Sequence, residues 1–125
     1  MSGSPQILTQ NNPADPIPTA TGATFKTMVL QRAGPVAVEF MSYGCEHCGT
    51  IEPILQQVAE MVKDQMIFCK VNVANDPALG EEFDIRATPT LVMFLRGKPV
   101  GRVEGPRPSV SAVLTAVSHP FRTIK

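Results

Sequence analysis

The sequence predicts an α/β fold with a central mixed β-sheet of four to five strands, flanked by helices on both faces. Short apolar runs of strand length alternate along the chain with longer stretches whose apolar residues recur at helical spacing. Helices separate the earlier strands, which allows parallel pairing, whereas a short turn joins the last two, which favours antiparallel pairing. A length of 125 residues accommodates one domain with a hydrophobic core.

The first half of the chain contributes two helices and one buried strand. Residues 1–20 are polar and interrupted by prolines, so they are expected to be mostly irregular. Either 6–9 or 17–20 is expected to supply a short edge strand, and 17–20 is preferred. Residues 24–32 form an amphipathic pattern that predicts a helix, and the apolar run 36–41 predicts a strand. A helix then runs to about residue 64, because apolar residues form one stripe along it: Ile51, Ile54, Leu55, Val58, Ala59 and Val62.

The second half contributes the remaining strands of the sheet. The alternating apolar stretch 66–73 predicts a strand, and Pro77 opens a short helix at 78–83. Residues 90–95 and 100–104 predict a hairpin, because only a short turn containing glycine separates them. A proline just before the second of these strands, at position 99, favours an edge position for it.

A final helix is expected from Pro108-Ser109 to His119-Pro120. The chain is therefore expected to comprise a mostly irregular extension at 1–20, one domain at 21–119 and a tail at 120–125.

Composition excludes several classes of function. Eleven basic and eleven acidic residues cancel, so there is no excess of positive charge for binding nucleic acid. No apolar run reaches the roughly 20 residues of a membrane span, and the N-terminus lacks an apolar signal-peptide core. A monomer in the cytoplasm is expected. Three cysteines are too few for a disulfide scaffold, so the setting favours a catalytic or metal-binding Cys-x-x-Cys pair over a structural one.

Cys45 and Cys48 lie where the strand 36–41 gives way to a helix. The first N–H groups of a helix lack acceptors within it, and its dipole is positive there, so both effects favour a thiolate. We expect Cys45 to be the nucleophile. Cys48 continues the apolar side of the helix, so it is expected to be less exposed and to act as the resolving thiol in dithiol–disulfide exchange. A structural or metal-ligating Cys45 is the alternative.

With its surroundings, this motif resembles thioredoxin over about Thr24 to Val117. The matching residues are Val36–Phe40, Cys45-Glu46-His47-Cys48, Pro53, Lys70, Thr88-Pro89-Thr90, Gly97 and Gly105. The resemblance implies a thioredoxin fold and a protein thiol–disulfide oxidoreductase that reduces or exchanges disulfides in client proteins. It further implies that a thioredoxin-reductase-type or other dithiol donor supplies the electrons, and that the protein binds no cofactor.

The resemblance also assigns roles to residues outside the cysteine pair. The acid matching Glu39 accepts the proton of the second cysteine, and Lys70 is its neighbour. Glu39 stands where thioredoxins usually carry Asp. Because the strand around it is apolar, we expect this carboxylate to have a raised pKa or a partner, and we assign it a general-base role.

Five residues are assigned to client binding on the same basis: Tyr43, Gly44, Thr88, Pro89 and Gly105. Pro89 is expected in the cis form, with Thr88 offering backbone groups to an extended client segment and Gly105 leaving room for it. Gly44 replaces the tryptophan usual in the family.

Glu46 and His47 replace the usual Gly-Pro between the cysteines and are expected to tune the redox potential. A His47 cation favours the Cys45 thiolate, stabilises the reduced form and makes the disulfide a stronger oxidant. Glu46 acts in the opposite direction. His at this position is shared with disulfide isomerases and oxidases, and we predict a potential more oxidising than that of an ordinary thioredoxin.

Two other classes of function remain open. A thioredoxin fold can hold zinc or an iron–sulfur cluster through Cys45 and Cys48, with a dimer completing the four ligands. A redox adaptor can dock one partner without turnover. Cys69 lies in a core-like strand and is expected to be a small buried hydrophobe.

Overall fold

The computed structural model describes residues 17–122, which form a four-stranded sheet in the order β2-β1-β3-β4. Its strands are β1 (Pro35–Met41), β2 (Ile67–Asn72), β3 (Thr90–Leu95) and β4 (Lys98–Glu104). β1 pairs in parallel with β2 and antiparallel with β3, and β3 pairs antiparallel with β4. The predicted mixed sheet, the hairpin and the edge position of the last strand are confirmed.

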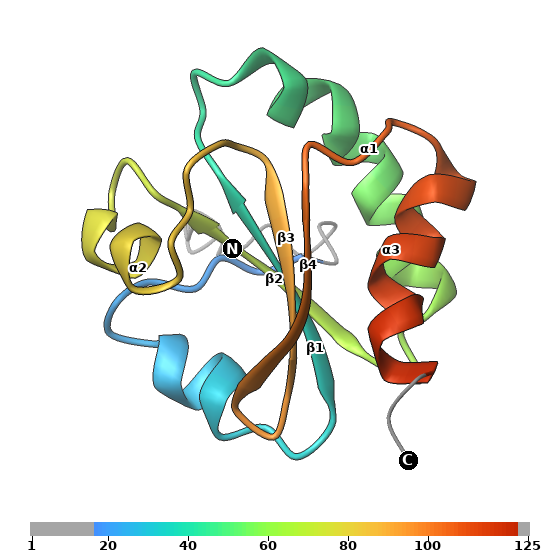
Figure 1. The fold of residues 1–125 in the computed structure, drawn as a ribbon, viewed down its shortest axis with the longest axis horizontal. Coiled ribbons are helices and arrows are strands. Elements are labelled where there is room, and N and C mark those ends of the chain that lie inside the picture. The colour runs from blue at the N-terminus through green and yellow to red at the C-terminus, as the bar shows by residue number, and fades with distance from the viewer. Residues whose placement is uncertain (1–16, 123–125) are drawn as a thin grey trace, which may run out of the picture.

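Helices cover both faces of this sheet, as predicted (Figure 1). They are η2 (Lys26–Leu30), α1 (Glu46–Met61), α2 (Pro77–Glu82) and α3 (Val110–Arg122). The helices α1 and α3 pack on one face, and η2 and α2 lie on the other. No helix among residues 17–122 combines the length and apolarity of a membrane span.

Two helices differ from the prediction. The expected helix at 24–32 is a single π-helical segment, because the Gln31 N–H donates to the carbonyl of Lys26 five residues earlier, at 2.9 Å. The last helix does not end at His119-Pro120 but continues to Arg122. Pro120 packs against Gly101 of β4 so closely that a Cβ added at Gly101 would lie 2.5 Å from the proline ring. This tertiary contact favours a helix that includes the proline.

Alternation along the strands sorts side chains between two cores. On β1, Ala37 faces the core beneath α1 and α3, while Val36, Val38 and Phe40 face the core beneath η2 and α2. Because successive side chains of a strand point to opposite faces, Glu39 shares the α1 side with Ala37. On β2, Lys70 shares this side with Phe68, and Lys70 is the register partner of Glu39.

Residues 17–20 extend the sheet at its β2 edge. Thr19 forms an isolated parallel bridge with Lys70, whose backbone bonds to Pro18 and Ala20 at 3.0 and 2.8 Å. Ile17 and Ala20 are fully buried. The preferred edge-strand segment therefore pairs where expected, although it forms one bridge rather than a strand. The rest of the predicted extension lies outside the described residues.

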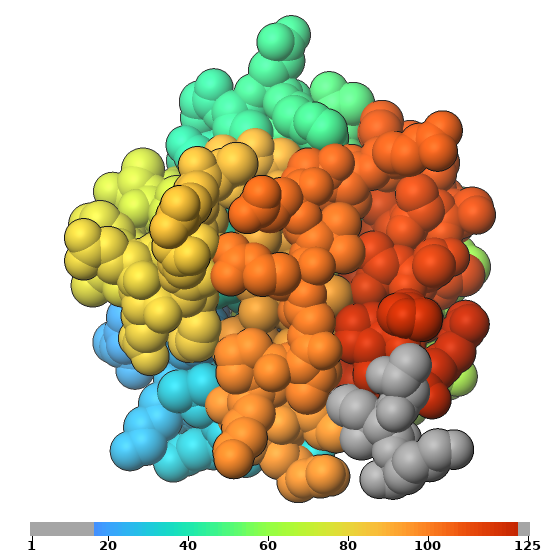
Figure 2. All heavy atoms as spheres, viewed as in Figure 1, coloured from blue at the N-terminus to red at the C-terminus, as the bar shows by residue number. Residues whose placement is uncertain are grey.

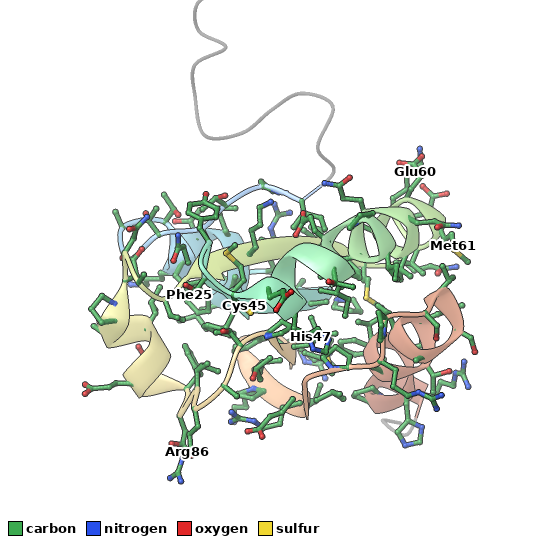
Figure 3. All side chains as sticks on the ribbon, turned by 90° about the horizontal axis from the view of Figure 1, so that it is seen from above. Phe25, Cys45, His47, Glu60, Met61 and Arg86 are labelled. Atoms are coloured by element: carbon green, nitrogen blue, oxygen red, sulfur yellow. A yellow bond between two sulfur atoms is a disulfide. The ribbon has the colours of Figure 1, made fainter. Side chains whose placement is uncertain are left out.

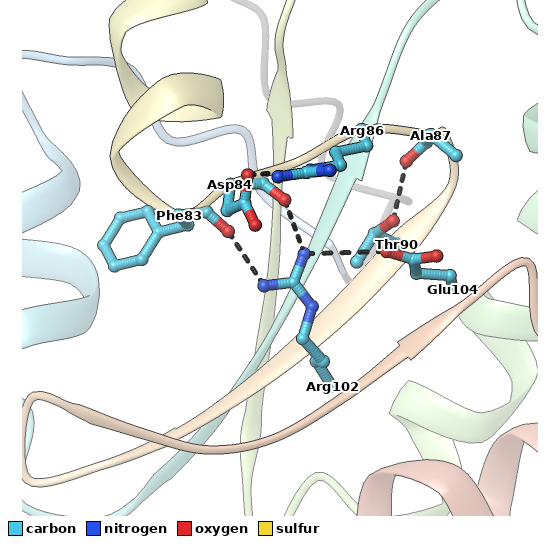
Figure 4. Close-up of polar contacts among 7 residues, drawn as sticks. All are labelled: Phe83, Asp84, Arg86, Ala87, Thr90, Arg102 and Glu104. Carbon is cyan, nitrogen blue, oxygen red and sulfur yellow. Dashed lines mark hydrogen bonds and ion pairs between the residues drawn. The ribbon is translucent and has the colours of Figure 1, made fainter.

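Arg102 of β4 holds the connection between α2 and β3 (Figure 4). Its guanidinium donates to the carbonyls of Phe83 and Asp84 at 2.9 and 2.8 Å. Asp84 has a φ of 55°, an unfavourable region for a residue with a side chain. Further along the connection, the Thr90 hydroxyl donates to the carbonyl of Ala87 at 2.6 Å. These contacts position the segment containing Thr88 and Pro89.

Replacing Arg102 with alanine is expected to lower the free energy of unfolding by about 1 kcal/mol, because two charge-assisted hydrogen bonds at a partly exposed site are lost. Denaturant titration should show a lower midpoint with an unchanged slope. The exposed Arg107 offers a matched control, and Arg107→Ala should leave the midpoint within about 0.5 kcal/mol of the parent. Equal midpoints for both variants would contradict the role of Arg102.

Candidate active site

Cys45 and Cys48 form a disulfide at the start of α1, where Figure 3 labels Cys45. Cys45 is the N-cap residue of the helix, and its sulfur accepts a hydrogen bond from the Cys48 N–H at 3.1 Å. The two Cα atoms are 5.2 Å apart. Cys45 is half-buried, whereas Cys48 is only 3% exposed. The expected difference in exposure is therefore present, and the first turn of the helix offers a donor to the more accessible sulfur.

Three segments distant in sequence lie together at one end of the molecule. These are the start of α1, the connection into β3 and the connection after β4 (Figures 1 and 2). The Cys45 sulfur lies 3.3 Å from the carbonyl oxygen of Thr88. The Thr88–Pro89 peptide bond is cis, as expected from the resemblance, and the Gly105 N–H donates to the Pro89 carbonyl at 2.8 Å.

Gly44, which precedes Cys45, and Gly105, which donates to the Pro89 carbonyl, both border open space. Gly105 has a φ of 55°, a conformation that glycine adopts without steric cost, and a Cβ at either glycine would meet no atom within 4 Å. Tyr43 is 77% exposed beside them. Among the residues assigned to client binding, Tyr43, Gly44 and Gly105 are exposed, Thr88 is half-buried and Pro89 is buried.

His47 contacts the connection after β4. Its Nε2 lies 3.1 Å from the carbonyl oxygen of Pro106, and since a carbonyl only accepts, Nε2 carries the donated proton. The imidazole is exposed, as is Glu46 in the same turn. The His47 side chain is therefore held by a contact that the sequence did not indicate.

Glu39 lies on the α1 side of β1 and is 1% exposed. Its register partner Lys70 reaches a small open pocket of about 180 Å³, lined also by Cys45, Cys48 and Glu52. There the Lys70 ammonium forms an ion pair with Glu52 at 3.2 Å. The structure thus brings Lys70 to the cysteines as expected. It adds Glu52, which the sequence analysis missed although Glu52 lies one helical turn beyond Cys48.

Cys69 of β2 points to the opposite core and is 1% exposed. Burial raises the pKa of its thiol to about 12, with a smaller opposing influence from Arg32. The expectation of a buried hydrophobe is confirmed. At pH values between the free thiol pKa of about 8.5 and the raised pKa of the folded protein, the Cys69 thiol is ionised in the unfolded chain but protonated in the native protein. The unfolded chain therefore binds fewer protons in this range. Stability contributed by this group is therefore complete below about pH 8.5 and falls as the pH rises.

The stability of the oxidised protein is expected to decline above about pH 8.5 with a contribution from Cys69 of up to about 1.4 kcal/mol per pH unit. Cys69→Ala should remove this contribution while retaining the slower decline caused by other groups. Denaturant titrations between neutral pH and about pH 10 measure the difference in slope, since the disulfide keeps Cys45 and Cys48 from titrating. Parallel declines in the two proteins would show that the Cys69 thiol ionises as readily when folded as when unfolded.

Within residues 17–122, no three His, Cys, Asp or Glu side chains are grouped so that they could hold a metal ion.

Comparison with known proteins identifies the family to which this chain is similar. Residues 16–116 match the thioredoxin family. The chain is 34% identical over 99 residues to thioredoxin 1 of Synechococcus elongatus, covering 79% of this chain and 92% of that protein. It is also 34% identical over 96 residues to the chloroplastic M-type thioredoxin of Chlamydomonas reinhardtii, covering 77% and 69%. A third relative is the bifunctional thioredoxin reductase/thioredoxin of Mycobacterium leprae, 33% identical over 85 residues, which are 68% of this chain and 19% of that protein.

A disulfide-bonded Cys-x-x-Cys pair at the first turn of a helix, facing a cis proline, accompanies these matches. The chain belongs to the thioredoxin family and is a thiol–disulfide oxidoreductase that uses the Cys45–Cys48 pair.

Proposed function

We propose that this protein reduces disulfides in client proteins, with Cys45 as the nucleophile and Cys48 as the resolving thiol. The observation that carries the proposal is the difference between the two sulfurs, because Cys45 is the more exposed and receives the Cys48 N–H. A thiolate at Cys45 attacks one sulfur of a client disulfide, and the other client sulfur leaves as a thiolate that takes a proton from water. The product is a mixed disulfide between Cys45 and the client.

In the second step Cys48 releases the client. The Cys48 thiol gives its proton to Glu39 and attacks the Cys45 sulfur, forming the intramolecular disulfide while the second client sulfur departs as a thiolate. Burial of Glu39 supports its role as proton acceptor, because a carboxylate removed from water holds a proton more readily. Lys70 lies opposite Glu39 in the register and moderates this effect.

The client is proposed to bind as an extended segment beside Thr88. The backbone before the cis bond lies at the Cys45 sulfur, and Gly105 next to it in space borders open solvent rather than another side chain. Tyr43 and Gly44 complete the surface, with Tyr43 offering an exposed aromatic ring. Such a surface accepts varied clients because backbone groups supply much of the recognition.

Electrons are proposed to come from a dithiol donor of the thioredoxin-reductase type. Each turnover leaves the Cys45–Cys48 disulfide, which a donor dithiol reduces as it becomes a disulfide itself. One relative combines a reductase and a thioredoxin in a single protein, which supports this class of donor. We place the reaction in the cytoplasm with the protein as a monomer, since reduction of clients requires a compartment that keeps dithiols reduced.

Insulin reduction with a dithiol donor tests the function directly. The parent protein should accelerate disulfide cleavage, and Cys45→Ser should give only the uncatalysed rate because no nucleophile remains to form the mixed disulfide. Acceleration by Cys45→Ser equal to that of the parent would refute the assignment of Cys45.

The potential of the pair is expected to be more oxidising than that of an ordinary thioredoxin, and His47 is the proposed cause. Titration against glutathione should show that His47→Gln shifts the equilibrium about threefold towards the disulfide, because a positive charge near the thiolate is lost. His119 lies on α3, and His119→Gln serves as the control with no expected shift. A parent potential equal to or below that of an ordinary thioredoxin would refute the prediction.

A further inference from the structure

Glu52 lies on α1 one turn beyond Cys48, and its side chain helps to line the pocket beside both cysteines. One of its oxygens, Oε2, receives two donors. The Lys70 ammonium approaches it at 3.2 Å, and the Gln56 side-chain amide donates to it at 3.2 Å. The Lys70 and Glu52 side chains are 14% and 24% exposed, so water screens this ion pair only in part.

Lys70 therefore lies between two acids at different depths. Glu39, its register partner on β1, is buried, whereas Glu52 borders the open pocket. A cation favours the charged form of a neighbouring carboxylate and so weakens that carboxylate as a proton acceptor. The same cation favours thiolate at a neighbouring sulfur. The strength of both effects depends on how much of the Lys70 charge is balanced by Glu52.

We propose that Glu52 is a positioning residue for the step in which Cys48 releases the client. Glu52 holds the Lys70 ammonium at the pocket wall, and this preserves the proton affinity of Glu39 while limiting the positive charge felt by Cys48. The proposal rests on the proton-acceptor role proposed for Glu39. The titratable groups that line this pocket are Tyr43 and Cys45 just before α1, Cys48 and Glu52 in its first two turns, and Lys70 on β2. Glu39 on β1 is the register partner of Lys70.

The test separates the two chemical steps. Reduced protein is mixed rapidly with an aromatic disulfide that releases one coloured thiol when Cys45 attacks and a second when Cys48 resolves the mixed disulfide. The rate of the second release is then measured across pH. In Glu52→Gln the midpoint of this profile should fall by about half to one pH unit, because the part of the Lys70 charge that Glu52 balanced then favours the Cys48 thiolate and weakens Glu39 as an acceptor.

Glu60→Gln is the matched control. Glu60 lies on the same helix at the far end from Cys45, paired with Lys63 at 2.7 Å (Figure 3). The pH profile of the second release in Glu60→Gln should have the same midpoint as that of the parent. Glu52→Asp keeps the charge and should restore most of the parent profile, which a purely structural role for the longer side chain would not predict.

A double variant tests whether Glu52 acts through Lys70. In a Lys70→Gln background, Glu52→Gln should move the midpoint by less than half the shift seen with Lys70 present. A shift of equal size in both backgrounds, or no shift in the single variant, would overturn the inference. If Glu39→Gln changes the second release but Glu52→Gln does not, only the inference on Glu52 fails. If Glu39→Gln also leaves it unchanged, the proposed proton transfer fails too.

Discussion

Replacing Cys48 with serine is expected to stop turnover and leave client proteins covalently attached to Cys45. Cys45 retains its exposure and its place at the helix start, so it still attacks the client disulfide. The mixed disulfide then persists, because serine does not displace a sulfur from a disulfide under these conditions. Insulin reduction should fall to the uncatalysed rate, while non-reducing gels and mass measurement show a protein–client adduct that a small thiol releases.

Two further variants make this result specific. Cys45→Ser should also abolish turnover but give no adduct, since the capturing sulfur is gone. Cys69→Ser should turn over at the parent rate, because the Cys69 thiol is buried in the opposite core. An adduct that resolves without Cys48, or that forms equally without Cys45, would contradict the assigned order of the two thiols.

Replacing Glu39 with glutamine is expected to slow the Cys48-dependent step on the order of 100-fold near neutral pH. Glutamine preserves the size of this buried side chain but no longer accepts the proton of Cys48. The first attack by Cys45 should change far less, because its thiolate is favoured by the helix start. Rapid mixing with the aromatic disulfide measures both steps in one experiment, and the loss should shrink at high pH as hydroxide deprotonates Cys48.

Glu82→Gln provides the comparison for Glu39→Gln, since Glu82 is an exposed acid at the end of α2. It should leave both steps unchanged. A second release that keeps its parent rate and pH profile in Glu39→Gln would show that the proton of Cys48 goes elsewhere.

Much of the fold was predictable because it depends on patterns within short stretches. Short apolar runs of strand length located the strands, and the predicted strand 90–95 agrees with β3 at both ends. The short turn at Gly97 predicted that the strands on either side of it pair as a hairpin, and Pro99 predicted that the second of them lies at the edge of the sheet. The Cys-x-x-Cys spacing at the junction of a strand and a helix, together with Thr88-Pro89-Thr90 downstream, predicted thiol–disulfide chemistry, with a metal site as the alternative.

The sequence by itself thus determined the order of elements, the mixed sheet and the reacting cysteine pair, because each follows from residues a few positions apart. Only the tertiary structure placed Glu52 against Lys70, His47 against Pro106 and Arg102 against the connection into β3. It also allowed α3 to continue through Pro120, which packs on Gly101. These contacts join residues about 18 to 59 positions apart, and their formation depends on how helices and strands pack in three dimensions.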